Sequence, residues 1–413
     1  MLQVCCCNFE IINVSLRLNK NYSEIIMEKK RKFKINGKLI FNILVIGLSL
    51  YFIIYFFVSE DGMIDLLKSP DGINWWWIIA GIIAFYSNIL VDAIVTLIYI
   101  RSNYPQFRFI DAVKVACVGV FFGAVTPSNT GGQPMQLYLM AKMKVSVGFG
   151  SSCMTQKFIV YQLVTTVFSI FAVIVKFEYF SEAFTNFWSS AFIVLGFLTQ
   201  LGVTALFLIV SFSKKITHKL LALIYKIMKM LKFVKNPTGK IRRVAREFDN
   251  FLKSNKRLMQ NKKRLALIFA LVFAQVMLIL SVPYFIYLSF GLPKIAAAHG
   301  QPVGNPFDFV CIQSFVLFTS NLVPLPGASG GAELAFTMYF GSYFVIGGIR
   351  KIKPAILLWR FITYYGAILI TFPFSFLTKG KDKDEEYKKS LNPPEDENDI
   401  DNEFVPTEKV KSN

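Results

Sequence analysis

The chain has 413 residues, of which 54% are hydrophobic and only 17% are charged. A soluble protein has roughly 45–50% apolar and about 25% charged residues, so this composition excludes a soluble two-domain enzyme. Six cysteines are too few for a disulfide-stabilised scaffold, and the apolar content is too high for a disordered chain. The composition predicts an integral membrane protein.

The net charge of +19 is concentrated in two stretches. Residues 28–38 carry six bases and one acid, and residues 212–264 carry seventeen bases and two acids. Lys and Arg beside long apolar runs mark the cytoplasmic side of a membrane protein. We therefore expect both stretches and both termini in the cytoplasm. No soluble module carries the charge, so we expect no nucleic-acid partner.

Six apolar runs are long enough to cross about 30 Å of hydrocarbon as helices. They cover residues 39–58, 75–100, 152–175, 187–211, 265–290 and 354–377. With the amino terminus inside, the loops 59–74 and 176–186 fall outside and are richer in acids than in bases, as the positive-inside rule favours. The basic residues at 350–353 fall on the unexpected side, but the two strong basic stretches outweigh this short cluster.

Two further apolar runs are too short to span and end in Pro- and Gly-rich breaks. Residues 110–125 lead into TPSNTGG at 126–132, and residues 307–323 lead into PLPGASGG at 324–331. A second short helix is expected after each break, at 134–143 and 332–346. The expected fold class is thus an all-α integral membrane protein with about six transmembrane helices and two re-entrant helical hairpins.

The chain contains an internal repeat. The pattern P-x-x-[ST]-G-G occurs at 127–132 and recurs 199 residues later at 326–331. A cation, Phe-Ile, a β-branched residue and Tyr occur at 157–161 and recur 203 residues later at 360–364. The four-residue slip between the two offsets fits an insertion around Gly347-Gly348.

We assign repeat A to residues 75–175 and repeat B to residues 265–377. Their first spans run in opposite directions through the membrane, so the repeats are predicted to be inverted. Inverted repeats with broken helices are typical of transporters, whose substrate site lies at the repeat interface. Helix amino termini after each Gly-Gly would suit an anionic headgroup. Alternatively, the Gly-Gly pairs only let helices pack closely.

Two cations lie inside predicted spans at positions related by the repeat. Lys157 and Arg360 are costly there, which favours a functional or paired role over snorkelling to the interface. Asp92 and Glu333 are the available acids, and either could pair with a cation or act as a proton site. We expect Lys157 and Arg360 to face one cavity, to hold one anionic group from two sides, and each to be dispensable for folding.

The remaining segments flank or interrupt a membrane domain at 39–377. Residues 1–38 are expected to form a basic cytoplasmic leader, and within it residues 1–27 are expected to be untranslated or disordered. Within 212–264, apolar residues and Lys at helical spacing predict an amphipathic helix on the cytoplasmic leaflet. Residues 378–413 are predicted to be an acidic, disordered tail. Only two His occur and no nucleotide-binding loop, so we expect no metal and no cofactor.

At these motifs the chain resembles the lysylphosphatidylglycerol synthase transmembrane (flippase-like) family, the membrane part of the multiple peptide resistance factor. The resemblance is carried by T-P-x-x-x-G-G-Q-P-M-Q at 126–136 and P-x-P-G-x-[SG]-G-x-x-E at 324–333, with Arg360 and Tyr364 in the last span. It covers roughly 39–377. The family's first motif often has an acid after the Gly pair, where this chain has Gln133. The resemblance implies a multi-pass protein of a bacterial cell membrane that moves a modified lipid between leaflets, and resistance to cationic peptides.

The repeat and the resemblance together give one set of candidate residues. The candidate substrate-binding residues are Thr126, Pro127, Gly131, Gly132, Gln133, Gln136, Lys157, Tyr161, Pro326, Gly330, Gly331, Glu333, Arg360 and Tyr364. Asp92 and Glu333 are the candidate proton or pairing sites, and no catalytic residue is expected.

Three functions stay open. The first is a flippase for an anionic or lysyl-modified phospholipid. The second is a phosphatidylglycerol lysyltransferase or its membrane partner, although the 36 residues after 377 are too few for the soluble transferase domain. The third is a proton-coupled transporter of small solutes. Expected partners are a membrane phospholipid, a separate lipid-modifying enzyme and further copies of the chain.

Overall fold

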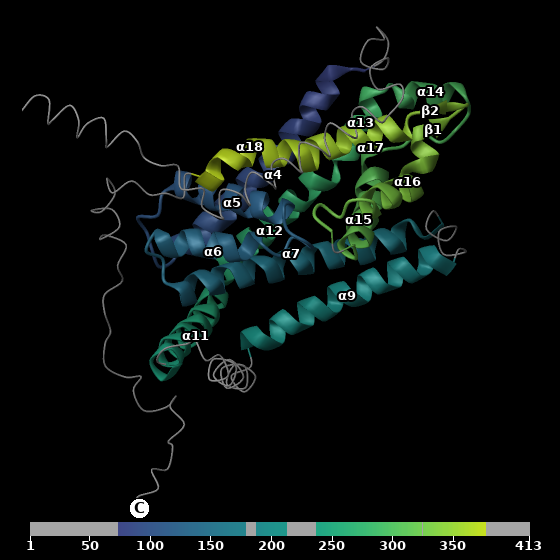
Figure 1. The fold of residues 1–413 in the computed structure, drawn as a ribbon. Coiled ribbons are helices and arrows are strands. Elements are labelled where there is room, and N and C mark those ends of the chain that lie inside the picture. The colour runs from purple at the N-terminus through teal and green to yellow at the C-terminus, as the bar shows by residue number, and fades with distance from the viewer. Residues whose placement is uncertain (1–72, 179–186, 213–236, 324, 377–413) are drawn as a thin grey trace, which may run out of the picture. The chain divides into compact units, whose positions relative to one another are not determined.

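The computed structural model describes residues 73–178, 187–212, 237–323 and 325–376, all within one compact unit of the chain. These residues are almost entirely helical, which confirms the all-α fold class (Figure 1). The leader 1–38, the predicted span 39–58 and the tail 378–413 lie outside the described residues.

Four described segments are long and apolar enough to cross a bilayer. They are α4 (Trp75–Arg101), α7 (Val147–Val175), α12 (Lys262–Leu280) with α13 (Val282–Ser289), and the rod of α17 (Ile352–Arg360), η1 (Phe361–Tyr365) and α18 (Gly366–Phe376). At 1.5 Å per residue α4 extends about 40 Å, more than the hydrocarbon thickness. The span predicted at 187–211 is α9 (Phe187–Phe212), which contains a shorter apolar stretch at Val194–Ile209.

Two of these spans contain interruptions that hydropathy does not reveal. Ser281 separates α12 from α13, because Pro283 lacks the N–H that the helical ladder needs. Directly after Arg360 the chain makes a π-helical turn, in which Gly366 N bonds to Phe361 O. Such turns are rare and occur frequently at functional sites.

The two predicted helix–break–helix elements are present. The first hairpin is α5 (Phe109–Ala124) with α6 (Gly132–Lys142), and the second is α15 (Pro306–Asn321) with α16 (Gly331–Phe344). Each enters and leaves on one side of the unit. Tyr104, before the first hairpin, accepts a hydrogen bond from the backbone N–H of Ser146, after it, at 2.9 Å. In the second, the rings of Phe309 and Tyr343 lie 5.1 Å apart.

A short β-hairpin explains the slip in the repeat. Strands β1 (Val345–Ile346) and β2 (Ile349–Arg350) pair antiparallel, with Gly347 and Gly348 both at positive φ in the turn. Two successive positive-φ residues are typical of the tight turns that join antiparallel strands, and glycine adopts them at least cost. The corresponding connection in repeat A, between α6 and α7, has only four residues, 143–146.

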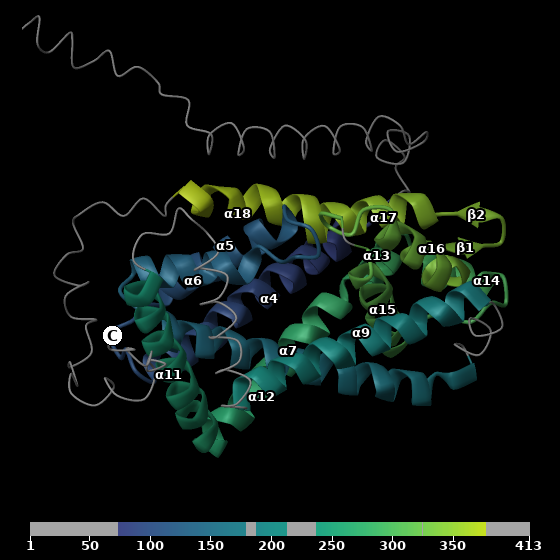
Figure 2. The ribbon, with the colours of Figure 1, turned by 60° about the horizontal axis from the view of Figure 1, so that its bottom comes forward.

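The first spans of the two repeats run antiparallel. At one end Asn74 N, before α4, donates to Ser289 O at the end of α13, at 2.7 Å. At the other end Ser102, after α4, lines a pocket together with Lys262, the first residue of α12. The helix contacts are also equivalent in the two repeats. The first hairpin helix of repeat A, α5, lies against α18 of repeat B, and the first hairpin helix of repeat B, α15, lies against α7 of repeat A (Figure 2). Both relations support an inverted repeat.

The end at which α4 stops and α12 starts is called the basic end below. Here α11 (Pro237–Gln260) packs along α7 and buries Phe251 and Leu258. A carboxylate oxygen of Glu247 accepts from Gly148 N at 2.6 Å, in the first turn of α7. This helix falls within the amphipathic segment predicted at 212–264, and the structure places its apolar face on α7 inside the protein.

Aromatic packing fills the opposite end of the unit. Phe309 of α15 lies between Tyr287 of α13, at 4.8 Å between ring centroids, and Phe340 of α16, at 5.2 Å. The ring of Phe336 lies tilted against that of Phe340, with 4.7 Å between their centroids. Such contacts add to area burial and give this Phe-rich chain a defined core around the second hairpin.

Candidate functional site

The breaks of the two hairpins meet each other. Pro127 in the first and Pro326 in the second form an antiparallel backbone bridge. These two residues are equivalent in the repeat, and an antiparallel pairing of equivalent positions is the arrangement expected of an inverted repeat. The structure thus brings both copies of the P-x-x-[ST]-G-G motif to one place between the two ends of the unit.

The motif makes the same turn in both hairpins. Thr130 Oγ1 donates to Pro127 O at 2.9 Å, and Ser329 Oγ donates to Pro326 O at 3.0 Å. A hydroxyl three residues after the proline therefore closes each break. Non-glycine residues take positive φ in both breaks, at Asn129 (59°) and Ala328 (52°). Such conformations persist where the surroundings fix them and are frequent at functional sites.

Arg360 holds the break of the second hairpin. Its Nε donates to Glu333 Oε1 at 2.7 Å, and its Nη1 donates to Gly327 O at 2.7 Å. The other Glu333 oxygen accepts from Gly330 N at 2.6 Å, at the start of α16. The Arg360 side chain is only 7% exposed. One guanidinium and one carboxylate thus bind the span, the break and the helix that follows it.

Tyr364 links the two repeats beside this ion pair. Its hydroxyl donates to Ala124 O, the last residue of α5, at 3.2 Å, and its ring lies 5.7 Å from the guanidinium carbon of Arg360. A Cβ on Gly327 would clash with this ring. Glycine is therefore needed at 327 for close approach, and also for its φ of 61°.

Lys157 pairs with an acid of a different element. Its Nζ lies 3.0 Å from Asp92 Oδ2 and donates to Thr96 Oγ1 at 3.1 Å, both on α4. The other Asp92 oxygen accepts from Gln275 of α12 at 3.4 Å. This network joins α4, α7 and α12, the long helices of both repeats.

These contacts change two expectations drawn from the sequence. Each cation pairs with an acid of its own repeat, and among the described residues no hydrogen bond or ion pair joins Lys157 to Arg360. Each was expected to be dispensable for folding, but each pairs with a half-buried acid, which argues against that expectation. Of the two roles suggested for Asp92 and Glu333, the structure shows pairing.

The helix starts after the two Gly-Gly pairs also differ from expectation. At α16 the N–H of Gly330 is already bound by the Glu333 carboxylate. At α6 the N–H of Gly131 is bound by the neutral hydroxyl of Thr126, at 2.8 Å. Of these two helices, only α6 has no acid in its first turn, so the positive potential at its amino terminus is not neutralised there.

The glycines and the glutamine of the first hairpin serve close packing. A Cβ on Gly132 would lie 2.7 Å from Gly119 O in α5, and Gln136 is buried against Gly119. Gln133 is half-buried. In the second hairpin a Cβ on Gly331 would clash with Val323. Close helix packing, the alternative reading of the Gly-Gly pairs, is therefore present in both hairpins.

Tyr161, the repeat partner of Tyr364, lines a small cavity of about 30 Å³ between α7, α9, α12 and α15. Polar side chains in its wall include Gln162, Thr165 and Gln200. The amide of Gln200 donates to Thr165 Oγ1 at 3.2 Å.

Sequence reasoning missed Gln275 and Thr96, both partners in the Lys157 network. Each is a polar residue inside a long apolar helix, which was a usable signal. Thr96 also follows Asp92 by four residues, so the two share a helix face. No signal in the sequence links α12 to Asp92, because that contact depends on tertiary packing.

Residues 40–371 match the family described as "Lysylphosphatidylglycerol synthase TM region". The chain belongs to this family. The match spans both hairpins and both repeats, which confirms the resemblance found in the motifs.

The chain is similar to proteins of a mycoplasma and of an archaeon. A Mycoplasma pneumoniae protein named "Uncharacterized protein MG306 homolog" is 24% identical over 321 residues, 75% of this chain and 79% of that protein. An Archaeoglobus fulgidus "UPF0104 membrane protein" is 26% identical over 298 residues, 66% of this chain and 79% of that protein. No solved structure matches this chain.

Proposed function

We propose that this protein moves an anionic or lysyl-modified phospholipid between the two leaflets of a cell membrane. The observation that carries the proposal is the bridge between Pro127 and Pro326, where the broken hairpins of an inverted repeat meet. Irregular backbone at membrane depth is tolerated where it is buried in protein or lines a wet cavity. In transporters built from inverted repeats, such breaks form the substrate site.

The two ion pairs suit a headgroup that carries both signs. A lysyl-modified phospholipid has a phosphate for a cation and an ammonium for an acid. Arg360 bonds to Glu333 through Nε alone, while Nη1 and Nη2 donate to Gly327 O and Ala328 O, and a phosphate oxygen could replace the carboxylate oxygen at Nε. The released Glu333, or Asp92 beside Lys157, could then accept the ammonium. If the phosphate and the ammonium of the lipid replaced the internal partners in this way, every one of these charges would stay paired.

The amino terminus of α6 supports the same assignment. It has no acid in its first turn, unlike α16, where Glu333 occupies the corresponding position. A phosphate near Thr126 and Gly131 would be favoured by the helix dipole. The candidate substrate-binding residues of the two hairpins would then bind different parts of one lipid.

We further propose that the basic end and both termini face the cytoplasm, because Lys and Arg gather on that side of membrane proteins. Movement of a lysyl-lipid to the outer leaflet would add positive charge there and repel cationic peptides. A separate enzyme would supply the modified lipid.

The test is lipid transfer in proteoliposomes that hold the full chain. Lysyl-phosphatidylglycerol in the outer leaflet is measured with an amine reagent that does not cross the membrane, and phosphatidylglycerol with a fluorescent acyl tail by external quenching. We expect transfer of at least one of these lipids, and slower transfer with Arg360→Lys, which keeps the charge but loses the fork. The matched control is Lys294→Gln, an exposed cation on α14 (Leu292–Ala298).

Absence of transfer for every anionic and lysyl-lipid tested would contradict the proposal. Transfer by Arg360→Lys at the rate of the unsubstituted protein would remove Arg360 from the substrate site. Incorporation of lysine from lysyl-tRNA into lipid by the purified chain would instead support the lysyltransferase. Solute uptake that depends on pH, without lipid transfer, would support the small-solute transporter.

A further inference from the structure

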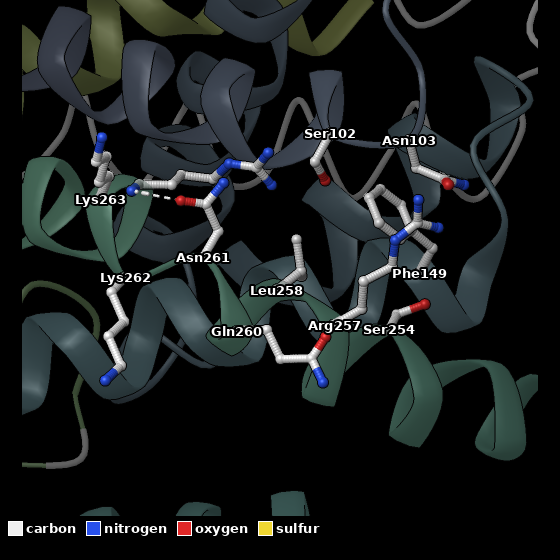
Figure 3. A pocket seen from close by; sticks show the side chains of 11 residues that line it. Ser102, Asn103, Phe149, Ser254, Arg257, Leu258, Gln260, Asn261, Lys262 and Lys263 are labelled. Carbon is white, nitrogen blue, oxygen red and sulfur yellow. Dashed lines mark hydrogen bonds between the residues drawn. The ribbon is translucent and has the colours of Figure 1, made fainter.

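A second polar site lies at the basic end, away from the hairpin breaks. It is a pocket of about 650 Å³, formed where α4 ends, α11 ends and α12 begins. Figure 3 shows Arg257 beside Asn103 on one side of this pocket and Asn261 near Lys263 on another, with Lys262 pointing away. The wall is completed by Ser102, Phe149, Ser254, Leu258, Gln260 and Arg264.

The charges around this pocket are of one sign. Four cations belong to its wall, namely Arg257, Lys262, Lys263 and Arg264, and the wall has no acidic residue. Within the part of the chain that the structure describes, no ion pair is found for any of the four. By contrast, Lys157, Arg360 and Lys253 each pair with an acid. An unbalanced group of cations around a hollow attracts an anion.

The hydrogen-bonding groups point to a phosphate. Asn103, Ser254 and Gln260 bring neutral donors to the same wall, whereas the hydroxyl of Ser102 donates to Tyr99 O. The 19-residue helix α12 begins here, and Asn261 caps only one of its first N–H groups, that of Arg264, at 3.0 Å. Arg side chains, neutral donors and a helix amino terminus are the groups that bind phosphate oxygens in proteins.

The depth of the pocket in the membrane is set by the apolar spans. Both Trp75–Arg101 and Lys262–Ser289 have the length and composition to cross the bilayer. The pocket lies at the end of the first and the start of the second, so it falls where hydrocarbon gives way to headgroups. Basic pockets between transmembrane helices at this level are known to hold the headgroups of anionic lipids.

We propose that this pocket binds a phosphate ester, as carried by the headgroup of an anionic phospholipid or by a soluble glycerol phosphate. The site is separate from the hairpin breaks, so its occupation does not depend on lipid transfer. Arg257 contributes a bidentate fork, and Lys263 and Arg264 add charge.

Binding is measured on the full chain in detergent, by titration with short-chain phosphatidylglycerol, short-chain phosphatidylcholine and glycerol 1-phosphate. The variant is Arg257→Gln/Lys263→Gln. The matched control is Lys294→Gln/Arg350→Gln, which removes two exposed cations at the opposite end. Thermal unfolding midpoints confirm that both variants fold, and no transfer assay enters the result.

We expect saturable binding of phosphatidylglycerol that is at least tenfold weaker in the pocket variant, unchanged in the control and weakened by salt. Phosphatidylcholine should bind less tightly than phosphatidylglycerol. Equal binding of glycerol 1-phosphate would identify the soluble ester as a sufficient ligand, and binding of the lipid alone would identify the headgroup in its membrane. Binding of neither ester, or equal weakening by the control, would overturn the proposal.

Discussion

At the scale of single residues, the internal ion pairs contribute to the folding of the protein. Arg360 is 7% exposed and Glu333 is 18% exposed, and each also bonds to backbone groups of the second break. A charge that loses its partner in such a place must be desolvated without compensation. These residues therefore serve folding as well as any substrate, which their hydropathy context alone does not suggest.

The first prediction concerns this pair. Arg360→Ala should lower the free energy of unfolding by about 3–5 kcal/mol, because it leaves the Glu333 carboxylate unpaired. Replacing both partners, as in Arg360→Met/Glu333→Gln, should recover a large part of that loss. Thermal unfolding of the purified chain measures both. If Arg360→Ala unfolded like the unsubstituted protein, the pair would have no structural role.

At the scale of elements, the hairpins depend on how closely their two helices approach. In the first hairpin Gly132 meets the backbone of α5, and in the second Gly331 meets Val323. The same motif therefore starts a helix and removes the side chain that would hold it away. Packing of this kind is typical of helices in membranes, where small residues let backbones come together.

The second prediction is a pair of Gly→Ala substitutions. Gly132→Ala should destabilise the protein by about 1–3 kcal/mol, because the new Cβ would lie 2.7 Å from Gly119 O. Gly202→Ala on α9 has no atom within 4 Å of the added carbon and should be neutral or stabilising by up to about 1 kcal/mol. Unfolding in denaturant compares the two. Equal effects would show that helix propensity, and not the contact, decides the outcome.

At the scale of the whole molecule, the two repeats contact each other through their breaks. The bridge between Pro127 and Pro326 and the bond from Tyr364 to Ala124 both cross from one repeat to the other. Alternating access in transporters of this type moves one repeat against the other around a fixed site. If the protein moves lipid as proposed, the contact between the breaks is expected to open or slide during each cycle.

The third prediction tests this movement. In a background without native cysteines, Pro127→Cys/Pro326→Cys should form a disulfide, since antiparallel partners lie within disulfide reach. Lipid transfer should stop on oxidation and return on reduction. Val345→Cys/Arg350→Cys is the matched control, because these residues are also antiparallel partners but lie within one repeat. Full transfer by the oxidised first pair would show that the breaks stay together during transport.

The sequence by itself determined the membrane class, the four long apolar helical segments that the structure describes, the two helix–break–helix elements and the sequence repeat. These depend on local composition, on hydropathy over about 20 residues, and on Pro and Gly, all of which act through short stretches of chain. Tertiary structure alone decided which charges meet, and it paired Lys157 with Asp92, and Arg360 with Glu333. It also decided the π-helical turn after Arg360, the bridge between the breaks and the basic pocket. Each of these joins residues far apart in the chain or depends on packing between helices, and no local pattern encodes which helix faces which.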